Sequence, residues 1–105
     1  MTHYYQFSKS LPYSRRKLNS AFVHALKKLC GIKHHLHVLE YLDNDDFGAF
    51  VSVNYPLDSE AKNEIIALCK RYGIGSDYIE TYEDVGDETK EYINIYLEKP
   101  CPYTD

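Results

Sequence analysis

The sequence predicts an α+β fold in which two helices cover one face of a four-stranded antiparallel sheet. Two segments carry apolar residues at helical spacing, and each is followed by two segments in which apolar and polar residues alternate. The connections within each pair of alternating segments are rich in Asp, Asn and Gly, which favour turns. The element order is therefore αββαββ. Neither αββ unit could bury its helix alone, so we expect all four strands to share one sheet in a two-layer sandwich.

Both helices have recognisable ends. Ser14 is a suitable N-cap for the first helix, and Gly31 lies where a left-handed C-cap residue would follow it. The second helix is expected to begin at Asp58 or Ser59 and to stop at Gly73. The apolar stripe of the first helix consists of Leu18, Ala21, Phe22, Ala25, Leu26 and Leu29. Each helix thus has one face that must pack against other elements.

Four strands are expected, at residues 36–42, 49–55, 78–82 and 92–97. Successive side chains of a strand point to opposite faces, so Ile93 and Ile95 share one face while Tyr92 and Tyr96 share the other. The aliphatic set should meet the helices, which leaves the opposite face aromatic, polar and partly open. Residues 3–7 could add an edge strand, and the fold would then be ferredoxin-like in shape.

The two halves of the chain resemble each other at a shift of 42 residues. The segment ALKKLCGI (25–32) then lies over ALCKRYGI (67–74), with five of eight positions identical. We expect one domain over residues 1–105, with a possible internal duplication of residues 14–56 and 57–99. The alternative is that similar physical demands shaped two similar segments.

Composition indicates an ordinary globular chain: 44% of its 105 residues are hydrophobic and 27% are charged. The sequence contains no run of 18 apolar residues, so we expect no transmembrane helix, and the first residues do not resemble a signal peptide. The three cysteines form no CxxC pair, which favours free thiols in a reducing compartment. These features lead us to expect a cytoplasmic protein.

Charge is distributed very unevenly along the chain. Residues 1–39 contain seven Lys and Arg and no acid, whereas residues 40–105 contain all sixteen Asp and Glu against five Lys and Arg. Such asymmetry bears on partners rather than on the fold. One interpretation is that two solvated faces partly neutralise each other. The other is that the acidic half docks on a basic partner.

The segment HLHVLEY (35–41) contains the clearest candidate for a metal site. His35 and His37 would lie on one side of a strand, where two imidazoles could hold a divalent cation. Tyr96 to Lys99 read YLEK, which fits a YxxK pattern. Together these motifs resemble those of rolling-circle replication initiators and related nickases. The resemblance implies His35 and His37 as metal ligands and Tyr96 as the nucleophile of a metal-dependent DNA-nicking protein.

Three features depart from that family. Tyr96 lies in an alternating strand pattern, whereas the family places its Tyr on a helix. No acidic strand precedes the His pair to supply a third ligand, and the surrounding half of the chain is acidic where DNA phosphates need basic residues. We therefore expect no catalytic residue, metal or cofactor, with His35 and His37 as half-exposed side chains beside Leu39 and Tyr41.

The open sheet face is a second candidate site. Its expected side chains are His35, His37, Tyr41, Phe50, Tyr92 and Tyr96. In outline they are similar to the aromatic platforms of RNA-binding sheets. No RNP-like sequence is present and the charge is unfavourable, so we do not expect nucleic acid as the ligand. Tyrosine serves protein interfaces equally well, so a protein partner or a second copy of the chain is the better expectation.

The expected turns carry clustered carboxylates, which we predict to be partner-binding together with two tyrosines. The predicted set is Asp43, Asp45, Asp46, Glu83, Asp84, Asp87, Glu88, Tyr41 and Tyr82. The turn sequence DNDDFG lacks the spacing of a calcium loop. Our hypothesis is a small acidic binding protein of the inhibitor or immunity type, which neutralises a basic protein such as a toxin nuclease by occlusion. The alternatives are the nicking protein described above and a homodimeric ligand-binding regulatory domain.

Overall fold

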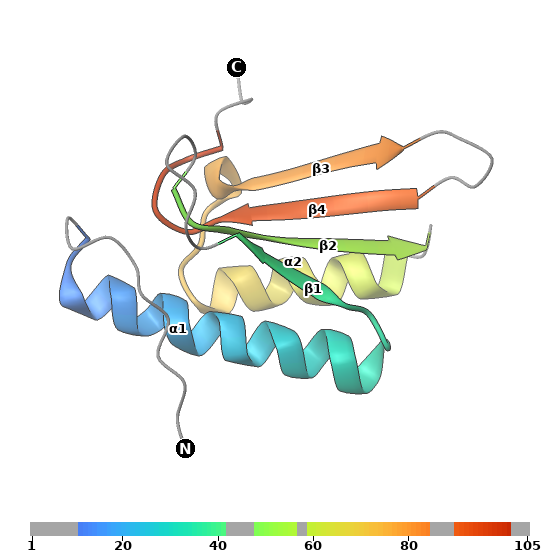
Figure 1. The fold of residues 1–105 in the computed structure, drawn as a ribbon, viewed down its shortest axis with the longest axis horizontal. Helices are drawn as coiled ribbons and strands as arrows, with labels where there is room; N and C mark the ends of the chain where they lie inside the picture. Colours follow the sequence, from blue (N-terminus) through green and yellow to red (C-terminus); the bar gives the residue numbers. More distant parts are fainter. Residues whose placement is uncertain (1–10, 42–47, 57–58, 85–89, 102–105) are drawn as a thin grey trace.

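The fold is a two-layer α+β sandwich, as the sequence predicts, and the computed structural model describes residues 11–41, 48–56, 59–84 and 90–101. Figure 1 shows both helices on the same side of the sheet. The sheet is antiparallel throughout, with strand order β1-β2-β4-β3. The elements are α1 (Tyr13–Lys28), a π-helical turn (Leu29–Lys33), β1 (Val38–Tyr41), β2 (Phe50–Pro56), α2 (Ser59–Arg71), a 3-10 turn (Ser76–Tyr78), β3 (Ile79–Asp84) and β4 (Lys90–Tyr96). The possible edge strand at residues 3–7 falls outside the described residues.

Helix α1 differs from expectation at both ends. Its N-cap is Pro12 rather than Ser14, and no side chain caps it. At the other end the helix does not stop at Gly31 but continues as a π turn, and the left-handed residue is His35, with φ of 56°. The amide of Leu36 donates to the carbonyl of Cys30 at 2.7 Å. This extra turn delays the start of β1 to residue 38.

Helix α2 ends as expected at Gly73, whose φ is 73°. The amide of Ile74 reaches back to the carbonyl of Cys69 at 2.9 Å, which is the long bond of a Schellman cap. The guanidinium of Arg15 on α1 donates to the carbonyl of Tyr72 at 2.7 Å. A cation from the first helix therefore lies at the negative end of the second helix dipole.

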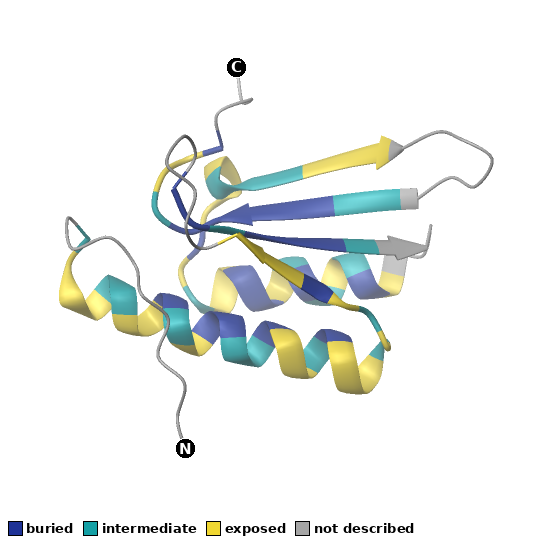
Figure 2. Ribbon diagram, viewed as in Figure 1, coloured by how far each residue is buried: buried dark blue, intermediate teal, exposed yellow. Residues whose placement is uncertain are grey.

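The core lies between the helices and the two central strands, and Figure 2 shows this burial along β2 and β4. The strands and the residues next to them contribute Val38, Ala49, Val51, Val53, Ile93, Ile95 and Leu97, and the helices and the π turn contribute Phe22, Val23, Leu26, Cys30, Ile65, Leu68 and Cys69. The expected assignment of the aliphatic strand residues to the helical side is confirmed. One polar side chain joins this layer: Asn19 is 1% exposed and donates to the carbonyl of Leu97 at 2.8 Å.

The two αββ units are related by an approximate two-fold axis normal to the sheet. Strands β2 and β4 pair antiparallel at the centre, and each is flanked by its own hairpin partner. Ser52 pairs with Asn94, which is its equivalent at the 42-residue shift, so the axis passes near this pair. An internal duplication would produce this arrangement, and the duplication itself stays a prediction.

Candidate functional site

The sheet face opposite the helices is the candidate site. Alternation along the four strands places ten described side chains there: Leu39, Tyr41, Phe50, Ser52, Asn54, Glu80, Tyr82, Tyr92, Asn94 and Tyr96. Among these, Glu80 is the only one with a formal charge at neutral pH. The remaining described members are aromatic, amide, hydroxyl or aliphatic, so the described part of this face carries one carboxylate and no other formal charge.

Aromatic rings form two stacked pairs at the outer strands. Tyr41 on β1 stacks on Phe50 at a centroid distance of 4.8 Å, and Tyr82 on β3 stacks on Tyr92 at 5.0 Å. In both cases the two residues are direct cross-strand partners, where such ring pairs are stabilising. Tyr96 extends the first pair by stacking on Phe50 at 5.2 Å. Tyr41 and Tyr82 remain 44% and 46% exposed.

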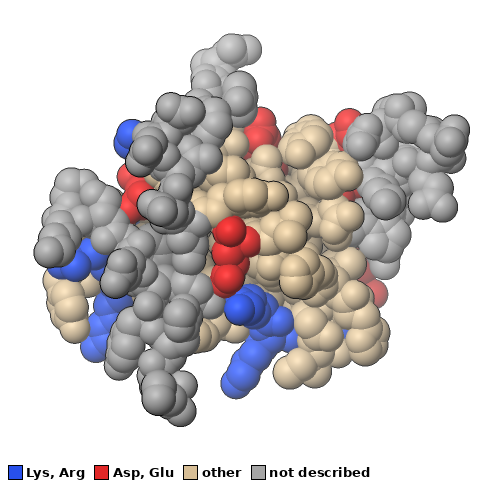
Figure 3. All heavy atoms as spheres, in the orientation of Figure 1, with Lys and Arg blue, Asp and Glu red and all other residues tan. Residues whose placement is uncertain are grey.

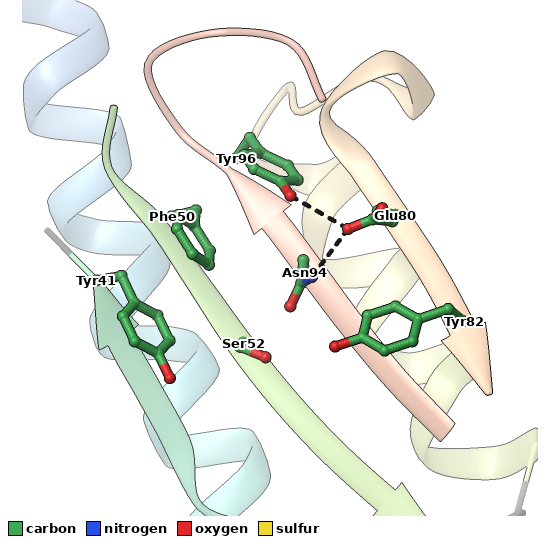
Figure 4. Close-up of a pocket in the computed structure, with 7 residues that line it drawn as sticks. All are labelled: Tyr41, Phe50, Ser52, Glu80, Tyr82, Asn94 and Tyr96. Atoms are coloured by element: carbon green, nitrogen blue, oxygen red, sulfur yellow. Dashed lines mark hydrogen bonds between the residues drawn. The ribbon is translucent and has the colours of Figure 1, made fainter. Parts of the chain in front are cut away.

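The centre of the face is hollow because its residues there are small. Ser52 and Asn94 are direct partners on β2 and β4, and both are largely buried. A groove of about 470 Å³ lies over them, and its rims are formed by Tyr41 and Tyr82. Figure 4 shows these two rings on opposite sides of the small central side chains. We call this hollow the central groove.

Glu80 is fixed in place at one side of the central groove. Its Oε1 accepts a hydrogen bond from Asn94 Nδ2 at 2.9 Å and another from the hydroxyl of Tyr96 at 3.1 Å. Tyr96 is itself 3% exposed, so the hydroxyl that orients the carboxylate is well ordered by packing. Figure 4 shows the two hydrogen bonds converging on the same oxygen.

The described members of the predicted partner-binding set do not lie together on one surface. Tyr41 and Tyr82 come together on the two rims of the central groove. Glu83 is exposed on β3 but lies on the helical side of the sheet, directly opposite Glu91 of β4. Asp84 is the last residue of β3. The other predicted acids, Asp43, Asp45, Asp46, Asp87 and Glu88, lie outside the described residues.

The expected position of the two histidines is wrong. His35 and His37 precede β1 instead of lying on it, so neither is paired in the sheet. The π turn extends to Lys33 and His35 has a left-handed backbone, so the residues before Val38 do not form the expected start of the strand. Both side chains are exposed.

Tyr96 also lies apart from the histidines. It ends β4, opposite Phe50, which in turn pairs with Tyr41 at the far end of β1 from His37. Strand spacing and rise place the backbones of Tyr96 and His37 roughly 16 Å apart. In the described part of the chain, no group of three or more His, Cys, Asp or Glu could hold a metal ion. The arrangement implied by the nickase resemblance is therefore not assembled among the described residues.

Two basic residues that follow α1 are partly neutralised by one acid of α2. Lys33 Nζ lies 2.6 Å from Glu64 Oε1, and His34 Nε2 lies 3.0 Å from Glu64 Oε2. The hydrogen bonds from Lys33 and His34 lower the pKa of the Glu64 carboxyl, and the bond to Glu64 raises the pKa of Lys33. In Figure 3 most visible basic atoms lie over α1, whereas most visible acidic atoms lie over the sheet.

The buried cysteines are unsuited to nucleophilic chemistry. Cys30, Cys69 and Cys101 are free and buried. Burial raises the pKa of the Cys30 thiol to about 11 and that of the Cys69 thiol to about 12. Both groups are therefore protonated at neutral pH and are poor nucleophiles.

Comparisons with known proteins identified no relative from which the role of the site could be inferred. No protein-family model, curated protein or solved structure was found to match the chain. None of the helices in the described residues is both long enough and apolar enough to cross a membrane.

The sequence interpretation placed Ser52 and Asn94 on the open face but did not count them, or Glu80, among the site residues. The signal for Glu80 was present, because alternation in Ile79 to Tyr82 places Glu80 on the same face as Tyr82. The central groove itself required the strand order, which brings Ser52 beside Asn94.

Proposed function

We propose that this chain is a non-enzymatic binding protein of the inhibitor type, which docks its open sheet face on a basic protein and occludes that partner's site. The observation that carries the proposal is the composition of this face. It presents stacked tyrosines around a central groove whose only formally charged described side chain is Glu80. Tyrosines supply large contact area with little loss of conformational freedom, and a carboxylate favours a cationic group in the partner.

A pair of acidic residues on the other face of the β3–β4 hairpin also favours a basic partner. Glu83 and Glu91 are direct cross-strand neighbours, and like charges in this position repel. Lys62 of α2 lines a hollow together with both acids, so one cation already offsets part of their charge. Both acids lie on the helical side of the sheet, so they would act on a partner at the open face through long-range attraction, which steers a cationic surface towards the edge strand β3 at low salt.

The size of the face is adequate for a specific interface. A standard protein interface buries about 800 Å² on each partner, and the backbones of Tyr41 and Tyr82 lie roughly 20 Å apart, across three strand spacings and four residues of rise. Aromatic residues near the centre of such an interface contribute most of its binding energy. We therefore assign Tyr41 and Tyr82 as the principal anchors of the complex.

Photo-crosslinking tests this function in cells of the source organism. A photoreactive phenylalanine analogue replaces Tyr41 or Tyr82 in the full chain, and the same replacement at Tyr13 serves as the control. Tyr13 is 71% exposed and lies on α1, in the other layer of the fold. We expect positions 41 and 82 to crosslink to the same basic protein and position 13 not to do so.

The captured partner then allows a quantitative test. We expect Tyr82→Ala to weaken binding of the purified partner about 10- to 100-fold, with Tyr13→Ala changing it less than about twofold. Binding should weaken as salt rises, and the partner's activity should be lost at a 1:1 ratio. An acidic partner, equal crosslinking from all three positions, or a partner that stays fully active in the complex would contradict the proposal.

A further inference from the structure

We propose that the central groove is an arginine-binding site, and that it receives one arginine side chain of the partner. This inference rests on the proposed function, because it names the group that the open face recognises. It starts from the shape of the groove. Ser52 and Asn94 leave room at the centre, while the stacked pairs of Tyr41 and Tyr82 rise on either side. An elongated side chain with a planar end fits between such walls.

The carboxylate of Glu80 is prepared for a cation. Its two hydrogen bonds, from Asn94 and from Tyr96, both end on Oε1. Within the described residues no hydrogen bond reaches Oε2. The carboxylate is therefore held in one orientation by neutral donors, with one oxygen left to accept from a ligand. No Lys or Arg is among the described side chains of this face to neutralise the charge.

The surrounding acceptors match a guanidinium. Because Asn94 donates through Nδ2, its Oδ1 is available as an acceptor, and Figure 4 shows this oxygen turned away from Glu80 and towards the centre of the groove. The Ser52 hydroxyl lies in the same lining. A guanidinium has five N–H donors in one plane, so it can pair with the carboxylate while it also donates to the amide and hydroxyl oxygens.

The aromatic walls favour arginine over other cations. A guanidinium stacks on the face of a tyrosine ring, whereas an ammonium is a strongly hydrated point charge. A divalent metal would need further charged ligands, and the described lining offers one carboxylate. A phosphate group would be repelled by Glu80. Arginine is the side chain that uses the carboxylate, the acceptors and the rings together.

An NMR titration of the full chain tests this inference with small probes. The probe is arginine blocked as its N-acetyl amide, and the controls are blocked lysine, blocked citrulline and free arginine. Citrulline has nearly the same shape as arginine but carries no charge. We expect blocked arginine to cause saturable shifts of the Asn94 side-chain amide and the Tyr82 ring, with millimolar affinity. Citrulline should bind at least tenfold more weakly, and lysine several-fold more weakly.

Two matched variants locate the site. Glu80→Gln retains an acceptor for Asn94 and Tyr96 but removes the charge, so the fold should persist while arginine affinity falls at least tenfold. Asp77→Asn makes the same change of charge on an exposed side chain of the 3-10 turn, and arginine affinity should be unchanged. Backbone amide spectra of both variants verify that they are folded.

The outcomes separate this inference from the proposed function. Equal binding of arginine and lysine, or arginine shifts that survive Glu80→Gln, would overturn the arginine site while crosslinking from Tyr82 could still succeed. Free arginine that bound at least tenfold more tightly than the blocked form would indicate a small-molecule ligand and would also overturn it. Arginine binding without any crosslinked partner would instead remove the proposed function.

Discussion

The first and second αββ units build the same framework around the central axis. Each unit supplies one helix, one hairpin and one stacked ring pair on the open face. The pair of Tyr41 and Phe50 in the first unit corresponds to Tyr82 and Tyr92 in the second, and their centroid distances are 4.8 Å and 5.0 Å. Repetition of this feature shows that the walls of the groove belong to the framework that both units share.

The hydrogen-bonded group of Glu80, Asn94 and Tyr96 on the open face belongs to the second unit alone. Leu39 pairs with Ser52 in the first hairpin, and Glu80 pairs with Asn94 at the equivalent place in the second. Tyr96, which donates to Glu80, corresponds to Asn54 at the 42-residue shift. The shared framework does not require this group in both units, and the proposed recognition of a partner would account for it.

Truncation of equivalent core residues tests whether the units share one core. Leu26 of α1 and Leu68 of α2 are equivalent at the 42-residue shift, and they are 0% and 8% exposed. We expect Leu26→Ala to lower the free energy of unfolding by about 3 kcal/mol, and Leu68→Ala by slightly less because its side chain is less completely buried. Urea denaturation followed by circular dichroism measures both.

The shape of the transition provides the control for this experiment. Both variants should unfold in one step with the denaturant slope of the wild type, because either leucine supports the same core. Two separate steps, or a cost below about 1 kcal/mol at one position, would mean that the units are stabilised independently.

Periodicity accounts for most of the framework but not for its irregular parts. The helix stop at Gly73 and the inward face of Ile93 and Ile95 were predictable, because each follows from one local rule. The π turn after α1 was not predictable, because a glycine at position 31 usually indicates that the helix stops. Whether the helix continues past Gly31 depends on packing against residues further along the chain. The same turn moved His37 off β1. The groove depended on strand order, which local periodicity does not specify.

The glycines at the two helix ends allow a second comparison of the two units, with smaller expected changes in the free energy of unfolding. Gly31 and Gly73 are equivalent, yet only Gly73 has a left-handed backbone. We expect Gly73→Ala to lower the free energy of unfolding by about 1 kcal/mol, because a Cβ is strained in this conformation. Gly31→Ala should raise it by about 0.5 kcal/mol, since a Cβ there meets nothing within 4 Å and alanine costs less entropy in a helix.

Thermal and urea unfolding of the two alanine variants measure these opposite signs. The comparison is internally controlled, because the same substitution is made at equivalent positions. If both variants lost stability equally, the first helix would have to end in a left-handed residue at Gly31, and the π turn would be refuted.

The smallest expected effect concerns the ion pair that joins the two units. Glu64 of α2 occupies the position equivalent to Phe22 of α1, and it meets Lys33 and His34 of the first unit instead of entering the core. Because Lys33 and His34 lower the pKa of Glu64, its contribution to stability is present above the ordinary carboxyl pKa and is lost as pH falls through the lowered value. The raised pKa of Lys33 adds a contribution that is lost only as pH rises through that higher value.

Carbon-detected NMR titration of the Glu64 carboxyl measures this link directly. Lys33→Met should move the pKa of Glu64 up towards its ordinary range, since the largest cause of the depression is removed. Lys28→Met is the matched control, because Lys28 is exposed near the end of the same helix and should leave the Glu64 pKa unchanged. The side chain of Lys33 is 55% exposed and that of Glu64 is 27% exposed, so solvent ions reach the pair and added salt should shrink the shift in the wild type. A Glu64 pKa that ignored both Lys33→Met and salt would show that the two units meet through their shared core without this electrostatic contact.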